Sequence, residues 1–260
     1  MTASITRDKT RRKIEILIVA LLWLLLWEAA ALIINEEILF VSPHKVLSAL
    51  FRLGATSDFW KTILLSIVRV LGGFVLGYLL SAILASLAFK FSFFKSFLSP
   101  AISVIKATPV ASFIILALMW SGKNFVPVII CILMVTPIVW SNVLEGLSSV
   151  DKNLLEMAQV YGMKPAARIK SIYVPSLIPY NAAAIGSGLG LCWKAGIAAE
   201  VICRTLPSIG NSIWETKFYI ITDEMFAWTA TVVILSVIFD KLIKLFMGRV
   251  LSKYKTEAAK

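Results

Sequence analysis

Long apolar runs dominate this sequence of 260 residues, and they restrict its possible folds more than any other feature. Hydrophobic residues make up 59% of the chain, charged residues make up 16%, and the mean hydropathy is +0.86. Soluble domains are less apolar and carry about a quarter charged residues. A run of about 20 apolar residues has the length that a bilayer-spanning helix needs. The composition therefore predicts an all-α, polytopic membrane bundle forming one domain.

The apolar runs predict about six transmembrane helices. They cover 14–34, about 62–89, a stretch ending near Trp120, 125–144, 177–199 and 226–246. Pro100 and Pro109 bracket the start of the third span, and Pro127 and Pro137 are expected to bend the fourth. Short interfacial helices are expected in the two connecting segments 35–61 and 200–224.

The positive charges distinguish the two sides of the membrane. The chain has 26 Lys and Arg against 15 Asp and Glu, a net charge of +11. If both termini lie inside, the inner segments, which include a basic arm at 1–13 and a basic tail at 247–260, hold 17 of the 26 when Lys241 and Lys244 at the inner end of the sixth span are counted with them, and the outer segments hold six. Cytoplasmic loops show this excess, so the charge needs no nucleic-acid partner. The first apolar run is too long for a secretory signal, and we expect it to be retained.

Small residues recur every four positions in two spans. The second span contains Gly73, Gly77, Ser81 and Ala85, a stripe that lets another helix approach closely. In the fifth span, Ala182, Gly186 and Gly190 lead on the same face to Lys194, an ionisable residue at membrane depth.

A polar stretch from Glu156 to Pro175 separates the fourth and fifth spans. Asp151 is placed to cap a helix that runs to Tyr161, and Gly162 offers the left-handed conformation that commonly ends helices. A second short helix is expected over 166–173, before Pro175. On the first helix, residues at three- and four-residue steps form an apolar face: Leu154, Leu155, Ala158 and Tyr161.

Two interpretations of this helix remain open. It can lie flat on the lipid headgroups, or its apolar side chains can insert into a groove of another protein.

Several kinds of chemistry lack their usual residues. The sequence has no GxxxxGK[ST] loop for nucleotide phosphates and no HExxH motif. The single histidine, His44, lies in an outer segment, where we expect it to be solvated. Cys131, Cys192 and Cys203 are unevenly spaced and are interpreted as small packing residues.

The stretch Glu156 to Pro175 resembles the signature loop of the permease subunits of ABC importers. That pattern is Glu-Ala-Ala, three residues, Gly, nine residues, Ile, one residue, Leu-Pro; here Met157 replaces the second residue and Val174 the Leu. From about 60 to 246 the chain is similar to permeases of the nitrate, sulfonate, taurine and bicarbonate type. The supporting stretches are SIVRVLGGFVLG (66–77), KATPVASFIILALMWSG (106–122) and WKAGIAAEVI (193–202). The chain departs from the family at Thr108-Pro109, where a Leu-Pro pair is typical, and at 208–210.

The resemblance implies a type I ABC importer permease in a bacterial plasma membrane, with both termini cytoplasmic. The chain would be a single transmembrane permease domain over 1–260, with a core at 60–246 and a coupling loop at 151–175. Its implied partners are a second permease copy, ABC ATPase subunits, an external solute-binding protein and the lipid bilayer. ATP and Mg²⁺ would bind the partner ATPase, so this subunit is expected to hold no cofactor and to be no enzyme by itself.

Two sets of residues are candidates for function. The resemblance assigns coupling to the ATPase to Leu155, Glu156, Met157, Ala158, Tyr161 and Gly162. Polar or aromatic groups that lipid would penalise are candidates for the solute pathway: Arg69, Asn142, Trp193, Lys194 and Glu200. A Lys at this depth suits an anionic solute.

Structural roles are the alternative for two of the pathway candidates. Lys194 can instead pair with a carboxylate such as Glu200 or Glu28 to hold helices together. Arg69 can snorkel toward the interface or pair with an acidic residue.

Two other classes of function also remain. An ion-coupled secondary transporter normally has more spans and intramembrane carboxylates, and a membrane scaffold subunit would not need the spacing of the loop.

Overall fold

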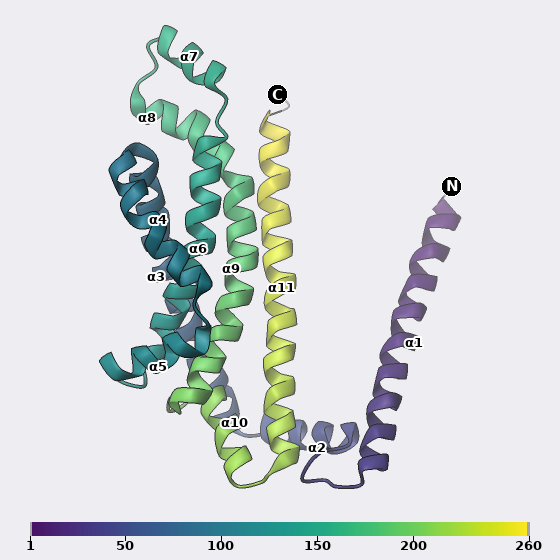
Figure 1. The fold of residues 1–260 in the computed structure, drawn as a ribbon. Coiled ribbons are helices and arrows are strands. Elements are labelled where there is room, and N and C mark those ends of the chain that lie inside the picture. Colours follow the sequence, from purple (N-terminus) through teal and green to yellow (C-terminus); the bar gives the residue numbers. More distant parts are fainter. Residues whose placement is uncertain (1, 259–260) are drawn as a thin grey trace. The chain divides into compact units, whose positions relative to one another are not determined.

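The computed structural model describes the backbone of residues 2–258 and the side chains of residues 14–249. These residues form helices and no strand: α1 (Thr2–Ile34), α2 (Pro43–Gly54), α3 (Ser57–Lys90), α4 (Ser92–Ala107), α5 (Val110–Trp120), α6 (Val126–Ser148), α7 (Lys152–Val160), α8 (Pro165–Arg168), the π-helical turn η1 (Ile169–Tyr173), α9 (Val174–Cys203), α10 (Ile209–Phe218) and α11 (Thr222–Ala258) (Figure 1). The predicted fold class, an all-α membrane bundle, is confirmed. The side chains of the predicted basic arm, and those of the tail beyond 249, lie outside the described residues.

The chain divides into two compact units. One comprises Met1–Trp60 and Ser212–Thr231, and the other comprises Lys61–Asn211 and Val232–Lys260. The prediction of a single domain stays a prediction.

The first unit is held together by aromatic and ionic contacts. Trp27 of α1 donates through Nε1 to the carbonyl oxygen of Val41 at 3.0 Å, and its ring lies 6.2 Å from that of Phe226. Arg52 of α2 binds the carboxylates of Asp223 and Glu224 at 3.0 and 2.9 Å. Hydrogen bonds from this guanidinium to Glu224 and Asp223 raise the pKa of Arg52, so it stays charged. The helix α2 begins at Ser42-Pro43, as the sequence predicts.

Within its unit, the apolar segment Ile14–Ile34 of α1 is largely exposed, since only 6% of its most apolar 18-residue window is buried. An exposed apolar segment of this length is unfavourable in water and suits a lipid environment.

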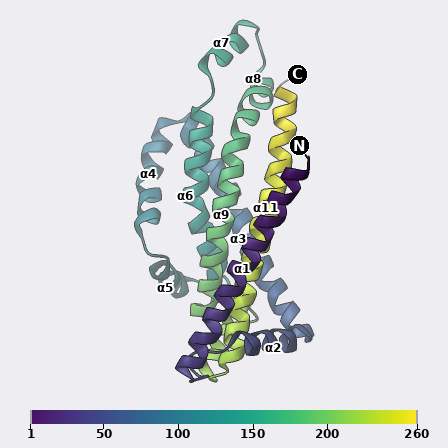
Figure 2. The ribbon, with the colours of Figure 1, turned by 90° about the vertical axis from the view of Figure 1, so that its right-hand side faces the viewer.

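The second unit is the packed helical core (Figures 1 and 2). Its helices α6 and α9 lie side by side, and a buried cluster that includes Ile114, Ile130 and Ala199 joins them to α5. α3 packs on α6 through the predicted small-residue stripe, where Ser81 Oγ donates to Thr136 Oγ1 at 2.9 Å. The second predicted stripe differs, because Gly186 and Gly190 of α9 have open space beside them.

Close packing at Gly77 provides a test of this interface. A Cβ atom at Gly77 would lie 2.8 Å from the Cα atom of Ile132, whereas one at Gly72 meets no atom within 4 Å. We expect Gly77→Ala to lower the thermal midpoint of the purified protein, since overpacking costs about 1–3 kcal/mol. Gly72→Ala on the same helix is the matched control. Equal midpoints for the two variants would show that α3 and α6 do not pack this closely.

The described helices match the predicted spans only in part. Four helical segments are long and apolar enough to cross a membrane: Ile14–Ile34, Ser57–Lys90, Val126–Ser148 and Pro165–Cys203. The pair α4 and α5, bent by 110°, gives up to five. The sixth predicted span lies within α11, which is continuous but not among these four, and that span carries Asp240, Lys241 and Lys244.

The third span differs from its prediction. Pro100 lies inside α4, and the chain breaks instead at Thr108 and Pro109, where α5 begins (Figure 2). At 11 residues, α5 is too short to cross a bilayer alone. The break follows from Pro109, because a residue before proline is driven toward extended backbone, and Thr108 has ψ 133°.

The expected stop before Pro175 is wrong. A single helical segment runs from Pro165 to Cys203, and Val174 donates its N–H to the carbonyl oxygen of Ile169 in a π-type bond. The wider π turn shifts the hydrogen-bond pattern by one residue. Pro175, which has no N–H, therefore lies in the first turn of α9, where the lost hydrogen bond costs little. The loop is therefore continuous with a spanning helix.

Candidate functional site

The short helix α7 is fixed at both ends by local hydrogen bonds. The Asp151 carboxylate accepts from the Asn153 N–H at 2.8 Å, which confirms the predicted N-cap. At the other end Gly162 has φ +61°. The N–H of Gly162 reaches the carbonyl oxygen of Gln159 at 3.0 Å, and that of Met163 reaches Ala158 at 2.9 Å. These two bonds form the Schellman motif. Its central residue adopts a left-handed backbone conformation, which favours glycine.

One face of α7 packs on the loop that follows it. Ala158 is 1% exposed and forms a buried cluster with Val150 and Ile172. Leu155 packs against the same cluster. These contacts join α7 to the segment that continues into α9.

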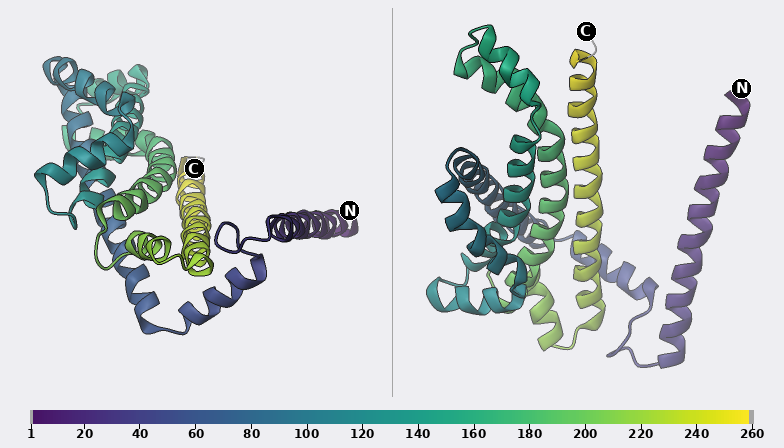
Figure 3. Two further views of the ribbon diagram at one scale, coloured as in Figure 1. Left: turned by 60° about the horizontal axis from the view of Figure 1, so that its bottom comes forward. Right: turned by 45° about the horizontal axis from the view of Figure 1, so that its top comes forward.

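The opposite side of α7 carries apolar side chains with nothing packed on them. Leu154 and Met157 are about half exposed, while Val160 and Tyr161 are 85% and 80% exposed. The sequence predicted one apolar face with Leu154, Leu155, Ala158 and Tyr161; in the structure Leu155 and Ala158 pack on the loop, whereas Leu154 and Tyr161 are exposed. Figures 1 and 3 show α7 beyond the ends of α6 and α9. The structure thus presents a small apolar surface at the tip of the core.

A groove of about 290 Å³ lies between α7 and the segment that follows it. Glu156 and Gln159 line it from α7, and Arg168 and Tyr173 line it from the returning segment. Arg168 is held there by a bond from its Nε to the carbonyl oxygen of Met163 at 2.9 Å. Of the predicted coupling residues, Leu155 and Glu156 line the groove, Ala158 is buried, and Met157 and Tyr161 are exposed without lining the groove.

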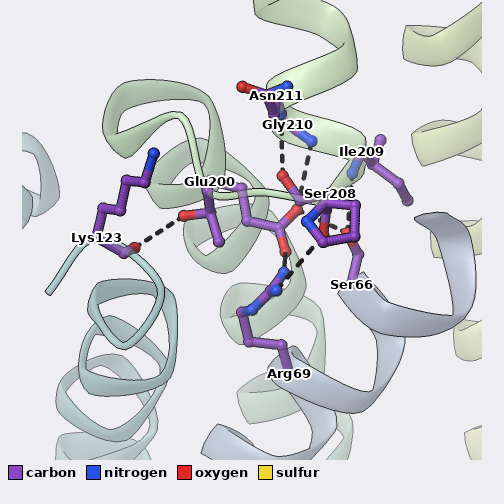
Figure 4. Close-up of polar contacts among 10 residues, drawn as sticks. Ser66, Arg69, Lys123, Glu200, Ser208, Ile209, Gly210 and Asn211 are labelled. Carbon is purple, nitrogen blue, oxygen red and sulfur yellow. Dashed lines mark hydrogen bonds and ion pairs between the residues drawn. The ribbon is translucent and has the colours of Figure 1, made fainter.

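At the opposite end of the core, Arg69 of α3 and Glu200 of α9 form a buried ion pair (Figure 4). Arg69 Nη1 lies 2.6 Å from Glu200 Oε1, and the Glu200 side chain has no exposed surface. The second carboxylate oxygen accepts from Ser66 Oγ at 2.8 Å and from the N–H of Gly210 at 3.3 Å. The same Ser66 hydroxyl accepts from the N–H of Ile209 at 2.9 Å. The pair therefore joins α3 and α9 to the start of α10.

This arrangement bears on two of the sequence alternatives. Arg69 pairs with an acidic residue rather than only snorkelling to the interface. Glu200 is engaged by Arg69, and Glu28 lies 3.3 Å from His44, so each carboxylate proposed as a partner of Lys194 has another partner. His44, which the sequence predicts to be solvated, is 66% exposed, but it also contacts the Glu28 carboxylate.

Trp193 is buried between α9 and α11. It is 2% exposed, its Nε1 donates to the carbonyl oxygen of Val232 at 3.3 Å, and its ring meets that of Phe239 edge to face at 5.0 Å. These contacts attach α11 to α9. The structure thus gives Trp193 a packing role.

Lys194 lies on the exposed side of α9. Exposed positions recur along this helix at Ala183, Ser187, Leu191, Lys194 and Ala198. The exposed face of α3 is different, since it carries bulky apolar residues such as Leu76, Leu79 and Ile83. Lipid suits the face of α3, whereas small and charged residues fit a second subunit or an aqueous pathway.

Sequence reasoning missed Lys106 as a site residue. It lies in the last turn of α4, before the break to α5, and lines a cavity of about 410 Å³ with the predicted pathway residue Asn142. Lys106 Nζ donates to Ser141 Oγ at 3.0 Å, and Asn142 Nδ2 donates to the carbonyl oxygen of Ile138 at 2.8 Å. The sequence does contain a signal for this site, because Lys106 lies two residues before a Thr-Pro pair that separates two apolar stretches. Such a pair marks a helix break. Among the predicted pathway residues, only Asn142 lines this cavity.

Comparison with protein families and known proteins gives concordant results. A sequence model of the family described as "Binding-protein-dependent transport system inner membrane component" matches residues 73–254. A probable ABC transporter permease protein of Brucella melitensis is 27% identical over 225 residues, covering 85% of this chain and 88% of that protein.

Two further relatives carry names that mention a solute. The putative aliphatic sulfonates transport permease protein SsuC of Escherichia coli is 25% identical, covering 70% of this chain and 69% of its own length. The bicarbonate transport system permease protein CmpB of Synechococcus elongatus is 26% identical, covering 60% and 56%.

Among solved structures, an inward-facing MetNI methionine ABC transporter is similar in fold. The TM-score is 0.56 at 17% identity, and the match covers 75% of this chain and 93% of that chain.

Proposed function

The chain belongs to the family of inner-membrane components of binding-protein-dependent transport systems, and from this premise we propose that it is the pathway-forming subunit of an ATP-driven importer for a small anionic solute. The protein is an ABC transporter permease with several membrane-spanning helices. We propose further that two copies enclose the pathway, that two ATPase subunits bind on the cytoplasmic side, and that an external binding protein delivers the solute.

The observation that carries this proposal is the exposed apolar surface of α7. A nine-residue helix is too short to be stable alone, yet here both ends are capped and one face is anchored. Its anchoring leaves Val160 and Tyr161 exposed, as a helix that inserts into a groove of a partner requires. In an ABC permease the natural partner for this surface is the ATPase.

The anchoring also suggests how movement is transmitted. ATP binding would close the two ATPase subunits and bring the two α7 helices together. Ala158 and Ile172 would carry that movement into the continuous segment Pro165–Cys203. The core would then switch between inward- and outward-facing states, each ligand favouring the state that it binds more tightly.

The proposed topology places α7 and both termini in the cytoplasm. The distribution of Lys and Arg supports it, since inner segments would hold 17 of the 26. The Arg69–Glu200 pair then lies near the outer end of the core.

The anionic character of the solute is supported by charge. Lys194 lies on the exposed side of α9, where small residues replace bulky ones. Two relatives are named for aliphatic sulfonates and for bicarbonate, and both of these solutes are anions. We therefore propose Lys194 and Asn142 as pathway residues, with Arg69, Trp193 and Glu200 holding the surrounding helices in place.

Energy dependence distinguishes this function from the alternatives. Uptake of radiolabelled ethanesulfonate, taurine and bicarbonate is measured in cells of the source organism with and without this chain. We expect uptake of at least one probe to need the chain, to stop when ATP is depleted, and to continue when ion gradients are collapsed with ATP maintained. Uptake that survives ATP depletion but follows the ion gradient would indicate a secondary transporter. Uptake of every probe that is unaffected by loss of the chain would contradict the proposal.

A further inference from the structure

The break between α4 and α5 borders an open cavity at the surface of the core. The cavity measures about 410 Å³, within the range of small-molecule sites. Its walls come from the end of α4, the start of α5, the middle of α6 and one residue of α9, Leu191. α4 and α5 meet at a bend of 110°. The first backbone N–H groups of α5 therefore have no hydrogen-bond partner within a helix.

Lys106 places a positive charge in this cavity without a compensating negative one. In the part of the chain whose side chains are described, no carboxylate lies within ion-pair distance of Lys106, in contrast to Arg52 and Arg69. Its ammonium group has three donor hydrogens, and the one bond it makes is to Ser141 Oγ at 3.0 Å. The Lys106 side chain is exposed, so a ligand that enters the cavity can reach its ammonium group. The cavity therefore favours an anion.

The other polar groups of the cavity are also arranged as donors. Ser141 Oγ accepts from Lys106, which leaves its own hydrogen available to a ligand. Asn142 has a second amide hydrogen beyond the one bound to Ile138. Val110 is the first residue of α5 and lines the cavity, so the positive end of this helix dipole faces it. A lysine, a hydroxyl, an amide and a helix start together suit a group with several negatively charged oxygens.

Leu191 connects this cavity to the exposed face of α9. It lines the cavity, and Lys194 lies three residues further along the same helix, about one turn away. Lys106 and Lys194 would thus both lie along the proposed pathway of the solute.

We propose that this cavity binds the oxyanion group of the transported solute, with Lys106 as its principal ligand and Ser141 and Asn142 as hydrogen-bond donors. The inference rests on the proposed import function and adds a binding site to it. A carboxylate, sulfonate or bicarbonate group has the required charge and oxygens. A phosphate of an anionic lipid shares this chemistry, so the test must distinguish the two sources.

Protection of Lys106 from acylation tests the site directly. The purified full-length protein in phosphatidylcholine nanodiscs is treated with an amine-acylating reagent, and mass spectrometry follows labelling of each lysine. Sulfate, ethanesulfonate and bicarbonate are added in turn at saturating concentration, against chloride at equal ionic strength. We expect at least one to slow labelling of Lys106 about tenfold while leaving Lys123 unchanged, since a charge-assisted bond contributes at least a tenfold effect. Lys123 is the internal control because it lies in the turn between α5 and α6, outside the cavity.

Each other outcome would overturn the inference. Equal slowing of Lys106 and Lys123 would indicate a general ionic effect, and slowing of neither would show that no oxyanion binds. Protection by phosphatidylglycerol in the nanodisc, without protection by any soluble oxyanion, would assign the cavity to a lipid headgroup. Any of these results combined with normal ATP-driven uptake would remove this site and leave the proposed function standing.

Transport by variants supplies a second readout. Lys106→Met is expected to lower uptake of the protecting anion about tenfold or more, and Lys106→Arg, which keeps the charge, is expected to retain more of it. Lys95→Met is the matched control, since Lys95 is an exposed lysine of the same helix that does not line the cavity. Equal uptake by Lys106→Met and Lys95→Met would contradict the inference.

Discussion

Arg69→Met is expected to lower the free energy of unfolding by about 3–5 kcal/mol, because it leaves the Glu200 carboxylate buried without its cation. Ser66 and the N–H of Gly210 still donate to the carboxylate, but neither supplies a charge. The loss would be measured by denaturant-induced unfolding in mixed micelles.

Two further variants test whether the loss of stability arises because the Arg69–Glu200 pair is buried. Arg52 also binds two carboxylates, but its side chain is 57% exposed, so Arg52→Met is expected to cost less than about 1 kcal/mol. The double variant Arg69→Met, Glu200→Gln removes both charges and should recover much of the loss. If Arg69→Met and Arg52→Met destabilise the protein equally, the pair is not the connection between α3, α9 and α10 that the structure shows.

Val160→Asp is expected to weaken binding of the ATPase about thirtyfold or more, with little change in the stability of the permease. Val160 is 85% exposed, so the folded subunit loses no packing when it is replaced. In the proposed complex the same side chain inserts into the ATPase, where a buried aspartate would be unpaired. Apolar anchors of this kind cost about 2 kcal/mol or more when removed, which weakens binding about thirtyfold. Co-purification of the ATPase at a fixed concentration measures the effect.

Ala166→Asp is the matched control for this variant. Ala166 is exposed in the same loop but belongs to the first turn of α8, where an acidic residue is well tolerated. We expect this variant to bind the ATPase normally. If Val160→Asp instead keeps the ATPase and only loosens the loop from lipid, α7 is the headgroup-bound helix that the sequence left as an alternative.

Local features of the site could be predicted from sequence because they depend on neighbouring residues. The caps at Asp151 and Gly162 are of this kind, since each is completed within a few positions along the chain. The start of α2 at Ser42-Pro43 is another example. Helical periodicity predicted the apolar residues of α7 but not which of them are buried, because that depends on Ile172 in the returning segment.

Features that depend on distant residues could not be predicted. Arg69 and Glu200 are 131 positions apart, and the sequence suggested Lys194 as a partner of Glu200 and no particular acidic residue for Arg69. The cavity at Lys106 exists because α4 and α5 bend by 110° and α6 covers the break, an arrangement that no local pattern specifies. The continuity of the helix through Pro175 was also missed, since a π turn just before the proline accommodates it.

The central claim is that this permease receives the movement of an ATPase through α7, and native mass spectrometry of the protein extracted gently from its own membrane tests it most directly. We expect two copies of the chain together with two ATPase chains for the wild type, and the permease without ATPase for Val160→Asp. A wild-type complex without ATPase, under conditions that preserve other membrane assemblies, would contradict the account. So would a Val160→Asp complex with the full complement of ATPase.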